Sequence, residues 1–343
     1  MKNGKKWGLL FLVLALLTGC AVILQSKSFS FSQFYHTLRS SSPGWMFAAI
    51  AAMLGFILFE GMSLLCIIKA FGYQASFCKG FLYSSADVYF SAITPSATGG
   101  QPASAYLMMK DGIPGAVVTI SLVANLIMYT LALMTVGVAG FVVRPEIFLH
   151  FHLPGRILII CGYTVLCGLT AAFLLVILKP RILEKICEFF LKLGRKLHLV
   201  RHEEEKRKKL QHTMEEYRQC AKAMADHKLV FVKAFVFNLL QRISQTTVTL
   251  LVYLAIGGSM SLAMDIWFTQ SYVTLGTYSV PIPGGMGVAD YLLIEGFGAY
   301  FNEAEAVNLE LISRGMSFYI CIMISAMTVF LGTIIAVKKR KSK

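Results

Sequence analysis

Charge is scarce in this sequence, and the motifs of ATP-driven and zinc-dependent chemistry are missing. Only 15% of the 343 residues are charged, whereas 56% are hydrophobic. The mean hydropathy of +0.66 is too high for a soluble domain of this length. The sequence contains no Walker phosphate loop, no dinucleotide-binding glycine fingerprint and no His-Glu-x-x-His zinc helix. We therefore expect no ATP-driven pump and no cofactor.

Cysteine spacing carries no pattern either. Most of the eight cysteines lie inside apolar runs, where cysteine behaves as a small hydrophobe. His150 and His152 have a spacing that two metal ligands can have, but the sequence offers no further ligand near them. We therefore expect no disulfide, no metal site and no catalytic residue.

Acidic residues are in deficit, and the basic residues are concentrated. The formal net charge is +14, and of 32 Lys and Arg, 14 lie in residues 179–228 and five after Val337. A basic surface can indicate nucleic-acid binding. In a chain this apolar it indicates the cytoplasmic face, which also meets anionic lipid. We therefore expect the membrane as a partner and no nucleic acid.

Apolar runs long enough to cross a bilayer core of about 30 Å recur along the chain. The first resembles a signal peptide with a lipoprotein-like box at Cys20, but its apolar run continues to Leu24, so we interpret it as an uncleaved span. We predict an all-α polytopic membrane protein with one integral domain over residues 1–343. Its parts are a first half (1–178), a basic connector (179–228) and a second half (229–343). The predicted full spans are 7–24, 45–70, 115–143, 157–178, 229–256 and 309–337.

Two further hydrophobic segments, about 80–109 and 263–301, are interrupted by glycine and proline. Proline removes a backbone donor and clashes with the preceding turn, so neither segment can be one continuous helix. In lipid, such free backbone groups are tolerated only where protein or a water-filled cavity surrounds them. Paired broken helices in two halves of a chain indicate the binding site of a transporter. The alternative is two ordinary loops between spans.

The distribution of basic residues predicts the orientation of both broken segments. The N- and C-termini are expected in the cytoplasm, as is the basic connector. Segment 80–109 must then begin and end inside, and segment 263–301 must begin and end outside. These are two re-entrant hairpins of opposite orientation, which is the topology of an inverted repeat.

The connector is the only sizeable polar stretch. Its first part has an apolar face of helical spacing beside basic residues, which predicts an amphipathic helix on the membrane surface. Residues 203–228 alternate acidic and basic groups, as in a solvated helix. The apolar face comprises Ile182, Ile186, Phe189, Phe190 and Leu193.

A polar stripe follows one face of the apolar span 229–256, and we interpret it as a binding surface. A charge in mid-membrane costs about 2.5–3.5 kcal/mol, so Arg242 should face the bundle interior and have a partner. That partner is either Glu60, within span 45–70, or a lipid phosphate, which a guanidinium can bind through two hydrogen bonds. The stripe comprises Asn238, Gln241, Arg242, Gln245 and Thr249.

Each broken segment restarts as a helix directly after its glycines, and a helix N-terminus with free amides is a ready anion site. Hydroxyl groups near both turns add donors. The acidic side chains there either brace the broken helices, compensate Arg242 and Arg314, or attract a cationic headgroup. The candidate binding residues near the turns are Asp87, Thr94, Ser96, Thr98, Gly99, Gly100, Gln101, Gly284, Gly285, Gly287, Asp290, Glu295 and Arg314.

The two turns, TPSATGGQP at 94–102 and PIPGGMG at 281–287, resemble the signature turns of the lysylphosphatidylglycerol synthase transmembrane-region family. This is the flippase-like membrane domain of the multiple peptide resistance factor, and the resemblance covers nearly the whole chain. It implies a multi-pass protein of the bacterial cytoplasmic membrane that moves phospholipid between leaflets. In the full-length resistance factor the lipid is lysyl-phosphatidylglycerol, and a cytosolic aminoacyl transferase domain follows the membrane part. We expect no such domain here, because the chain stops soon after its last predicted span.

The leading functional hypothesis is a flippase or transporter for an aminoacylated, anionic-type phospholipid. One alternative is the phosphatidylglycerol lysyltransferase activity for which the family is named, which would require lysyl-tRNA as a partner. Another is a transporter of a polyprenyl phosphate or a soluble anion, because a phosphate site looks alike in each. The sequence leaves open whether the chain forms a homo-oligomer.

Overall fold

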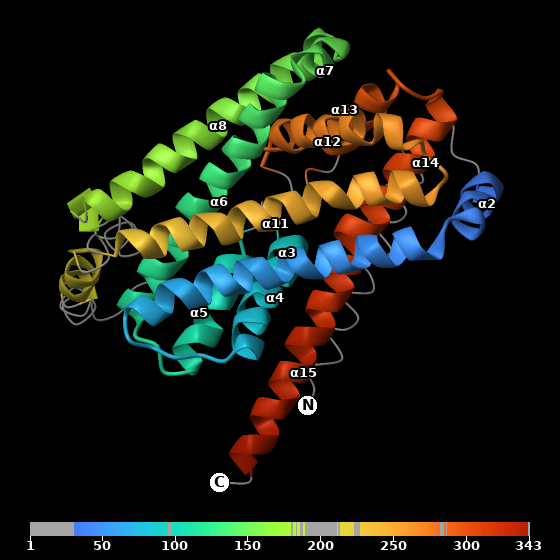
Figure 1. Cartoon of the computed structure of the whole chain (residues 1–343). Helices are drawn as coiled ribbons and strands as arrows, with labels where there is room; N and C mark the ends of the chain where they lie inside the picture. Colours follow the sequence, from blue (N-terminus) through green and yellow to red (C-terminus); the bar gives the residue numbers. More distant parts are fainter. Residues whose placement is uncertain are drawn as a thin grey trace, which may run out of the picture.

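The computed structural model describes residues 31–94, 98–179, 211, 213–222, 227–281 and 287–341, together with Arg181, Ile182, Glu184, Lys185, Glu188 and Gly285. Within these residues every regular element is a helix, as predicted. Figure 1 shows how the helices lie. They are α2 (Phe31–Ser40), α3 (Pro43–Ala70), α4 (Phe77–Ile93), α5 (Gly100–Lys110), α6 (Gly115–Val143), α7 (Pro145–His150), α8 (Leu153–Leu178), α11 (Lys228–Ala255), η2 (Met260–Leu262), α12 (Ala263–Thr277), α13 (Val288–Phe297), α14 (Glu303–Arg314), the π-helical turn η4 (Gly315–Ile320) and α15 (Cys321–Lys341).

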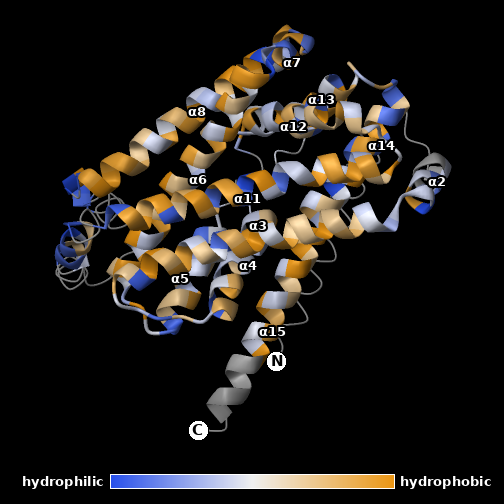
Figure 2. Ribbon diagram, viewed as in Figure 1, coloured by the Kyte–Doolittle hydropathy of each residue, from blue (hydrophilic) through white to orange (hydrophobic). Residues whose placement is uncertain are grey.

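Four helical stretches in the described part are long and apolar enough to cross a membrane: Pro43–Ala70, Gly115–Val143, Leu153–Leu178 and Glu303–Ile334. They correspond to four of the predicted spans. In Figure 2 hydrophobic residues dominate α8, whereas hydrophilic residues gather around α7 at one end and near the connector at the other. The predicted span 7–24 lies outside the described residues.

The predicted span 229–256 corresponds to one continuous helix, α11 (Lys228–Ala255), but this helix is not among the four apolar stretches. The polar stripe lowers its hydropathy. Instead of facing lipid on all sides, α11 packs along α3, and the two helices run antiparallel through the middle of the molecule (Figure 1). A count of six full spans therefore stays a prediction.

Both predicted interruptions are present. In the first broken segment, helix α4 ends at Ile93 and helix α5 begins at Gly100. In the second, helix α12 ends at Thr277 and helix α13 begins at Val288. Each pair of short helices packs together. The turn residues 95–97, 282–284 and 286, which include Ser96 and Gly284, lie outside the described residues.

The two halves exchange packing partners. Helix α15, from the end of the chain, packs against α4 of the first broken segment, and α6 and α8 pack against α12 of the second. Glycine permits this close approach: a Cβ on Gly162 of α8 would lie 1.9 Å from the carbonyl oxygen of Leu275 on α12. Small residues at such interfaces are what lets helix backbones approach in a membrane protein.

The described part of the connector is docked on the helices, in contrast to the solvated helix that its charges predicted. Met214, Tyr217 and Ala221 are buried and pack against α6, α8 and α11. The Tyr217 hydroxyl donates to the Val176 carbonyl oxygen at 3.2 Å, and burial raises the pKa of Tyr217 to about 12. The three buried residues form an apolar stripe at helical spacing within the charged sequence, and that stripe outweighs the charge alternation. Of the predicted amphipathic face before it, only Ile182 is described.

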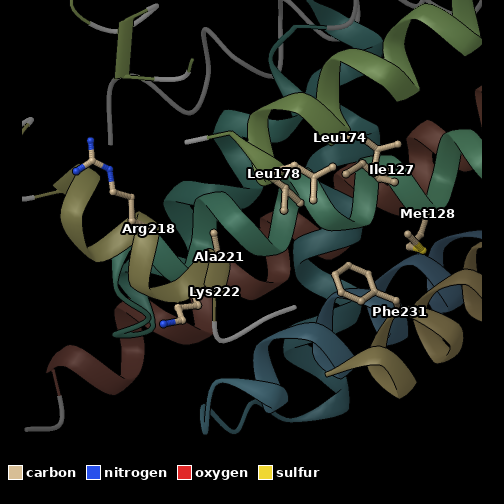
Figure 3. Close-up of a pocket in the computed structure, with 9 residues that line it drawn as sticks. Ile127, Met128, Leu174, Leu178, Arg218, Ala221, Lys222 and Phe231 are labelled. Carbon is tan, nitrogen blue, oxygen red and sulfur yellow. The ribbon is translucent and has the colours of Figure 1, made fainter. Parts of the chain in front are cut away.

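A pocket of about 520 Å³ lies where this connector helix meets the bundle (Figure 3). Its wall is mainly apolar, with Leu174 and Leu178 from α8 and Phe231 from α11, and Arg218 and Lys222 stand at its edge. The Arg218 guanidinium forms ion pairs with Glu184 and with Glu215. Both ion pairs are formed within the connector. The pocket lies at the junction between the connector and the helix bundle.

Candidate functional site

Arg242 is buried near the middle of α11 and lies against two aromatic rings. Its side chain is 2% exposed, and its guanidinium carbon lies 4.2 Å from the centroid of the Tyr129 ring and 4.9 Å from that of Phe56. Nη1 donates to Gln245 Oε1 at 2.6 Å and to the Tyr129 hydroxyl at 3.3 Å. Nε and Nη2 are buried and have no hydrogen-bond partner among the described residues. The rings stabilise the charge by cation–π attraction, but two donors remain unused.

The predicted partner Glu60 contacts the neighbour of Arg242 instead. Glu60 Oε2 accepts hydrogen bonds from Gln241 Nε2 and from Ser84 Oγ, both at 3.0 Å. Among the described residues no ion pair joins Glu60 to Arg242. The arginine is close enough to influence Glu60 electrostatically without pairing with it. Of the two partners considered from the sequence, the structure does not supply the carboxylate as a direct contact.

The first turn is held by Asp87 of α4. Asp87 Oδ2 accepts from Gln101 Nε2 at 2.7 Å, and the Asp87 carboxyl also lies within hydrogen-bonding reach of Glu60. Gly100 begins α5 directly against this carboxyl, since a Cβ there would lie 2.0 Å from Asp87 Oδ1. Only a residue without a side chain fits this position.

Thr94 closes the same turn. Its hydroxyl donates to the Phe90 carbonyl oxygen at 2.6 Å and accepts from the Gly99 amide at 2.8 Å. Thr98 is exposed on the turn. Of the residues predicted for the first turn, Thr94 and Gly99 therefore serve its geometry, whereas Asp87 and Gln101 connect it to the polar interior.

The second turn is held by an ion-paired cluster. The Gly287 amide donates to Asp290 Oδ2 at 2.9 Å, and Gly287 has φ +81°, a conformation that glycine adopts readily. Arg314 Nε lies 2.9 Å from Asp290 Oδ1 and 3.6 Å from Glu310 Oε1. Gly285 also has a positive φ, +61°, and a Cβ there would lie 2.7 Å from Thr277 Cβ. The expectation that Asp290 compensates Arg314 matches this geometry.

Glu295 lies apart from both turns. Its carboxyl is 5% exposed and contacts His152, accepting from the backbone amide at 2.6 Å and lying 2.8 Å from Nδ1. His152 precedes the first residue of α8, so the carboxylate stabilises the N-terminus of that helix. The structure thus gives Glu295 a bracing contact, and none of its described contacts is to Arg242 or Arg314.

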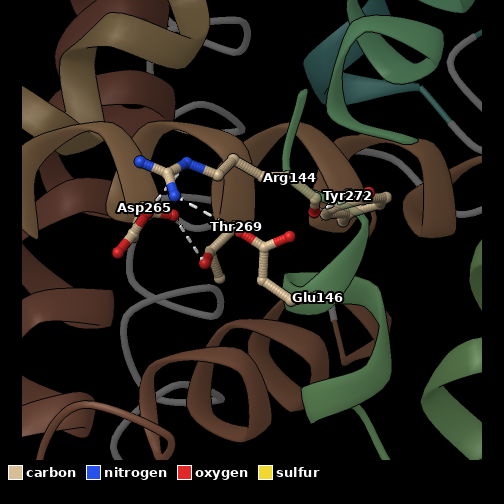
Figure 4. A network of polar contacts seen from close by, with 5 residues as sticks. All are labelled: Arg144, Glu146, Asp265, Thr269 and Tyr272. Atoms are coloured by element: carbon tan, nitrogen blue, oxygen red, sulfur yellow. Dashed lines mark hydrogen bonds and ion pairs between the residues drawn. The ribbon is translucent and has the colours of Figure 1, made fainter. Parts of the chain in front are cut away.

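A second bracing network fixes the start of α12 (Figure 4). Arg144, at the end of α6, lies 3.4 Å from Asp265 of α12 and 3.3 Å from Glu146 of α7. The Tyr272 hydroxyl donates to the Arg144 carbonyl oxygen at 3.2 Å. The network holds the N-terminal part of α12 against α6 and α7.

Sequence reasoning missed two tyrosines that complete the site. The Tyr129 hydroxyl, which contacts Arg242, makes a short hydrogen bond to the hydroxyl of Tyr278. Tyr278 directly follows α12 and belongs to the second turn. Tyr129 is a single tyrosine in the apolar helix α6 and has no local signal, whereas Tyr278 lies among the polar residues of a predicted turn.

These contacts place Gln241 and Arg242 of α11 between the two turns. Polar contacts connect Gln241 to the first turn by way of Glu60 and Asp87. Hydrogen bonds connect Arg242 to the second turn by way of Tyr129 and Tyr278. The arrangement offers an unsatisfied guanidinium, a pair of carboxyl groups and amide oxygens in one buried region. It has the chemistry to hold a headgroup that carries a phosphate. Within the described residues, no group of three or more His, Cys, Asp or Glu has the arrangement of a metal site.

One family model matches most of the chain. It is described as the lysylphosphatidylglycerol synthase TM region and matches residues 8–325, a stretch that contains both turns and every candidate residue. No curated protein matches the chain.

Proposed function

Because the chain belongs to the lysylphosphatidylglycerol synthase transmembrane-region family, we propose that it is a phospholipid flippase or transporter. Its substrate would be an aminoacylated, anionic-type phospholipid such as lysyl-phosphatidylglycerol, moved across the cytoplasmic membrane of a bacterium. The family match and the apolar helices make it a membrane protein. What we propose beyond this is the identity of the lipid and its movement between the leaflets.

The observation that carries the proposal is the unsatisfied guanidinium of Arg242. Its Nε and Nη2 are buried with no partner among the described residues, although a buried donor normally finds one. Leaving such groups unpaired costs about 1–3 kcal/mol or more. A phosphate that accepts hydrogen bonds from both nitrogens removes that cost, and it matches the forked geometry of the guanidinium.

The broken helices give the headgroup a place between the two halves. Each turn is linked to α11 by its own chain of polar contacts, so a headgroup held at Arg242 touches elements of both turns. The acyl chains would stay in the bilayer. Free backbone at membrane depth is tolerated where protein or a water-filled cavity surrounds it.

The exchanged packing of α15 on α4, and of α6 with α8 on α12, supports an inverted repeat. In this proposal both broken segments are re-entrant hairpins entering from opposite faces, with both termini and the connector in the cytoplasm. The two halves then rock about the antiparallel pair α3 and α11 to expose the site to each leaflet in turn. A homo-oligomer is compatible with this arrangement, which needs only one chain for the site.

The test is leaflet exchange of a labelled phospholipid in proteoliposomes. The wild-type protein should move the lipid, and Arg242→Ala should not, while its insertion and thermal unfolding stay measurable. A matched control is Arg144→Ala, which removes an arginine from a bracing network outside the site. Exchange at the protein-free rate by wild-type protein would contradict the proposal. Competition by a polyprenyl phosphate or a soluble anion, with no lipid exchange, would favour the corresponding transporter.

The description of the family model favours one second candidate, phosphatidylglycerol lysyltransferase. The purified protein would then transfer labelled lysine from charged tRNA to phosphatidylglycerol. This reaction needs a site for tRNA on the basic connector, not a phosphate at Arg242. A product that forms equally well in Arg242→Ala would identify the transferase; an absent product together with lipid exchange would identify the flippase.

A further inference from the structure

The carboxyl groups of Glu60, which is buried, and Asp87, which is partly buried, form a pair whose hydrogen-bond donors are neutral. They lie within hydrogen-bonding reach of each other. Glu60 accepts from Ser84 and Gln241, at 3.0 Å each, and Asp87 accepts from Gln101 at 2.7 Å. Every one of these donors is a hydroxyl or an amide. Two carboxylates that lie close together at low dielectric resist ionising at the same time, which favours one proton shared between them.

The second half of the molecule offers an internal comparison. Asp290 and Glu310 also lie close together, but the guanidinium of Arg314 is 2.9 Å from the first and 3.6 Å from the second. A cation therefore already stands at that pair. At the pair formed by Glu60 and Asp87 the corresponding cation must be supplied, either as a proton or by a ligand.

The other charged and titratable groups around the pair come from the helices packed on it. Arg242 of α11 and Cys321 of α15 both interact electrostatically with Glu60, and Tyr129 of α6 faces Arg242. Helix α5 contributes the neutral Gln101. With one proton on the pair, the charges of the two carboxyl groups and Arg242 sum to zero. Replacing that proton by another monovalent cation would keep this sum at zero, and a phosphate bound at Arg242 would add its own negative charge.

The glutamines that hold the pair also point to the nature of that cation. Gln101 and Gln241 donate their amide NH₂ groups to Asp87 and Glu60, and the Oε1 atoms of both glutamines are buried with no hydrogen-bond partner among the described residues. A carboxyl pair with two unused carbonyl acceptors beside it suits a group with several N–H donors. An ammonium carries three donors and no acceptor. A bare proton would leave both carbonyl oxygens unsatisfied.

We propose that the Glu60–Asp87 pair holds one proton when no lipid is bound and exchanges it for the ammonium of an aminoacylated lipid. This rests on the proposed function and adds its energy source. The ammonium enters as R–NH₃⁺, the shared proton leaves to water, and no covalent bond changes. The charge at the pair is the same before and after. Lipid and proton therefore move in opposite directions through the protein.

The consequence is a definite response to a pH gradient. Each pH unit is worth 1.36 kcal/mol per proton, so exchange of one proton for one lipid shifts the leaflet ratio by up to about tenfold. The experiment uses proteoliposomes with labelled lysyl-phosphatidylglycerol, and valinomycin with equal potassium on both sides to clamp the membrane potential. The lipid should accumulate in the leaflet that faces the acidic side. Phosphatidylglycerol, which has no amine, should show no shift. Protein-free liposomes report passive redistribution of the amine.

Glu60→Gln and Asp87→Asn should lose the shift, because an amide cannot take up the proton. Asp265→Asn is the matched control, since it neutralises a carboxyl in the outer bracing network, and it should keep the wild-type response. An unshifted ratio in wild type overturns the inference, as does a shift toward the alkaline side or an equal shift of phosphatidylglycerol. Leaflet exchange without a pH gradient, measured on the same vesicles, shows whether lipid moves, and where it does the proposed function stands in each of these results.

A measurement without transport separates the two ideas further. Infrared difference spectra of the lipid-free protein should show the C=O stretch of a protonated carboxyl that is missing in Glu60→Gln, and adding lysyl-phosphatidylglycerol should abolish it in wild type. A band that is absent, or that persists with the lipid bound, overturns the exchange even if lipid transport is normal. If the band is present and disappears when the lipid binds, but no lipid moves between the leaflets, the proposed function is wrong and the carboxyl pair is still an ammonium-binding site.

Discussion

Arg242 and Tyr129 form a cation–π contact that crosses from α11 to α6. The guanidinium carbon lies 4.2 Å from the ring centroid, and the same tyrosine hydroxyl reaches both Arg242 and Tyr278. Tyr129 thereby connects the buried charge to the second turn. Its ring stabilises the charge without using Nε or Nη2. The arginine is thus held in place and still able to bind an anion.

The first prediction follows from that contact. Arg242→Lys should lower lipid exchange about tenfold or more, because an ammonium cannot reproduce the two-pronged geometry, and a hydrogen bond to a charged group is worth about 1.5–3 kcal/mol. Thermal unfolding should change little, since the positive charge remains over the two rings. Exchange assays and thermal unfolding on the same preparation measure both quantities. Full exchange in the lysine variant would show that the phosphate does not bind at Arg242 in this way.

Tyr129→Phe isolates the hydroxyl from the ring. The variant keeps the cation–π contact but loses the hydrogen bonds to Arg242 and Tyr278, so lipid exchange should fall, and the free energy of unfolding should fall by about 1–3 kcal/mol. Tyr129→Leu removes the ring as well and should lower the stability further, because the cation–π contact is worth about 0.5–2 kcal/mol. If Tyr129→Phe transports lipid as fast as the wild type, the hydrogen bond between Tyr129 and Tyr278 is not needed to connect Arg242 with the second turn.

Valine at the turn glycines should abolish exchange. A Cβ on Gly100 would lie 2.0 Å from Asp87 Oδ1, and Gly285 has φ +61° with Thr277 beside it. The Gly100→Val, Gly285→Val double variant should insert into the membrane yet move no lipid. Gly168→Val is the matched control, because a Cβ on Gly168 of α8 meets no atom within 4 Å. Normal transport in the double variant would show that the turns do not need this close packing.

The sequence predicts the polar stripe and the two interruptions because both depend on local pattern. Polar residues at helical spacing in an apolar helix must face inward, and proline with glycine must break a helix. The structure buries Asn238, Gln241 and Arg242 and ends α4 and α12 near the expected residues.

Contacts between distant elements could not be predicted in the same way. Nothing local shows that Gln241, rather than Arg242, meets Glu60, or that Tyr129 lies between Arg242 and Tyr278. The connector shows a different limit. Its alternating charges predicted a solvated helix, but the buried Tyr217 docks it, because a narrow apolar stripe suffices where a complementary surface exists.

The last prediction concerns the orientation of the hairpins, and the chain carries its own probe. Cys78 is an exposed native cysteine at the start of α4, within the segment 72–79 that the charge distribution assigns to the cytoplasm. In a variant whose other seven cysteines are replaced by serine, a membrane-impermeant thiol reagent should therefore label Cys78 from the cytoplasmic face alone, and Cys78→Ser should abolish that signal. Cysteines introduced in the Cys78→Ser background should label from the same face at 110–112 and from the opposite face at 257–262 and 302–308. Segment 80–109 both begins and ends inside only if it turns back within the membrane. Labelling of 110–112 from the outer face would make α4 and α5 one crossing, and the two halves would then not be inverted repeats.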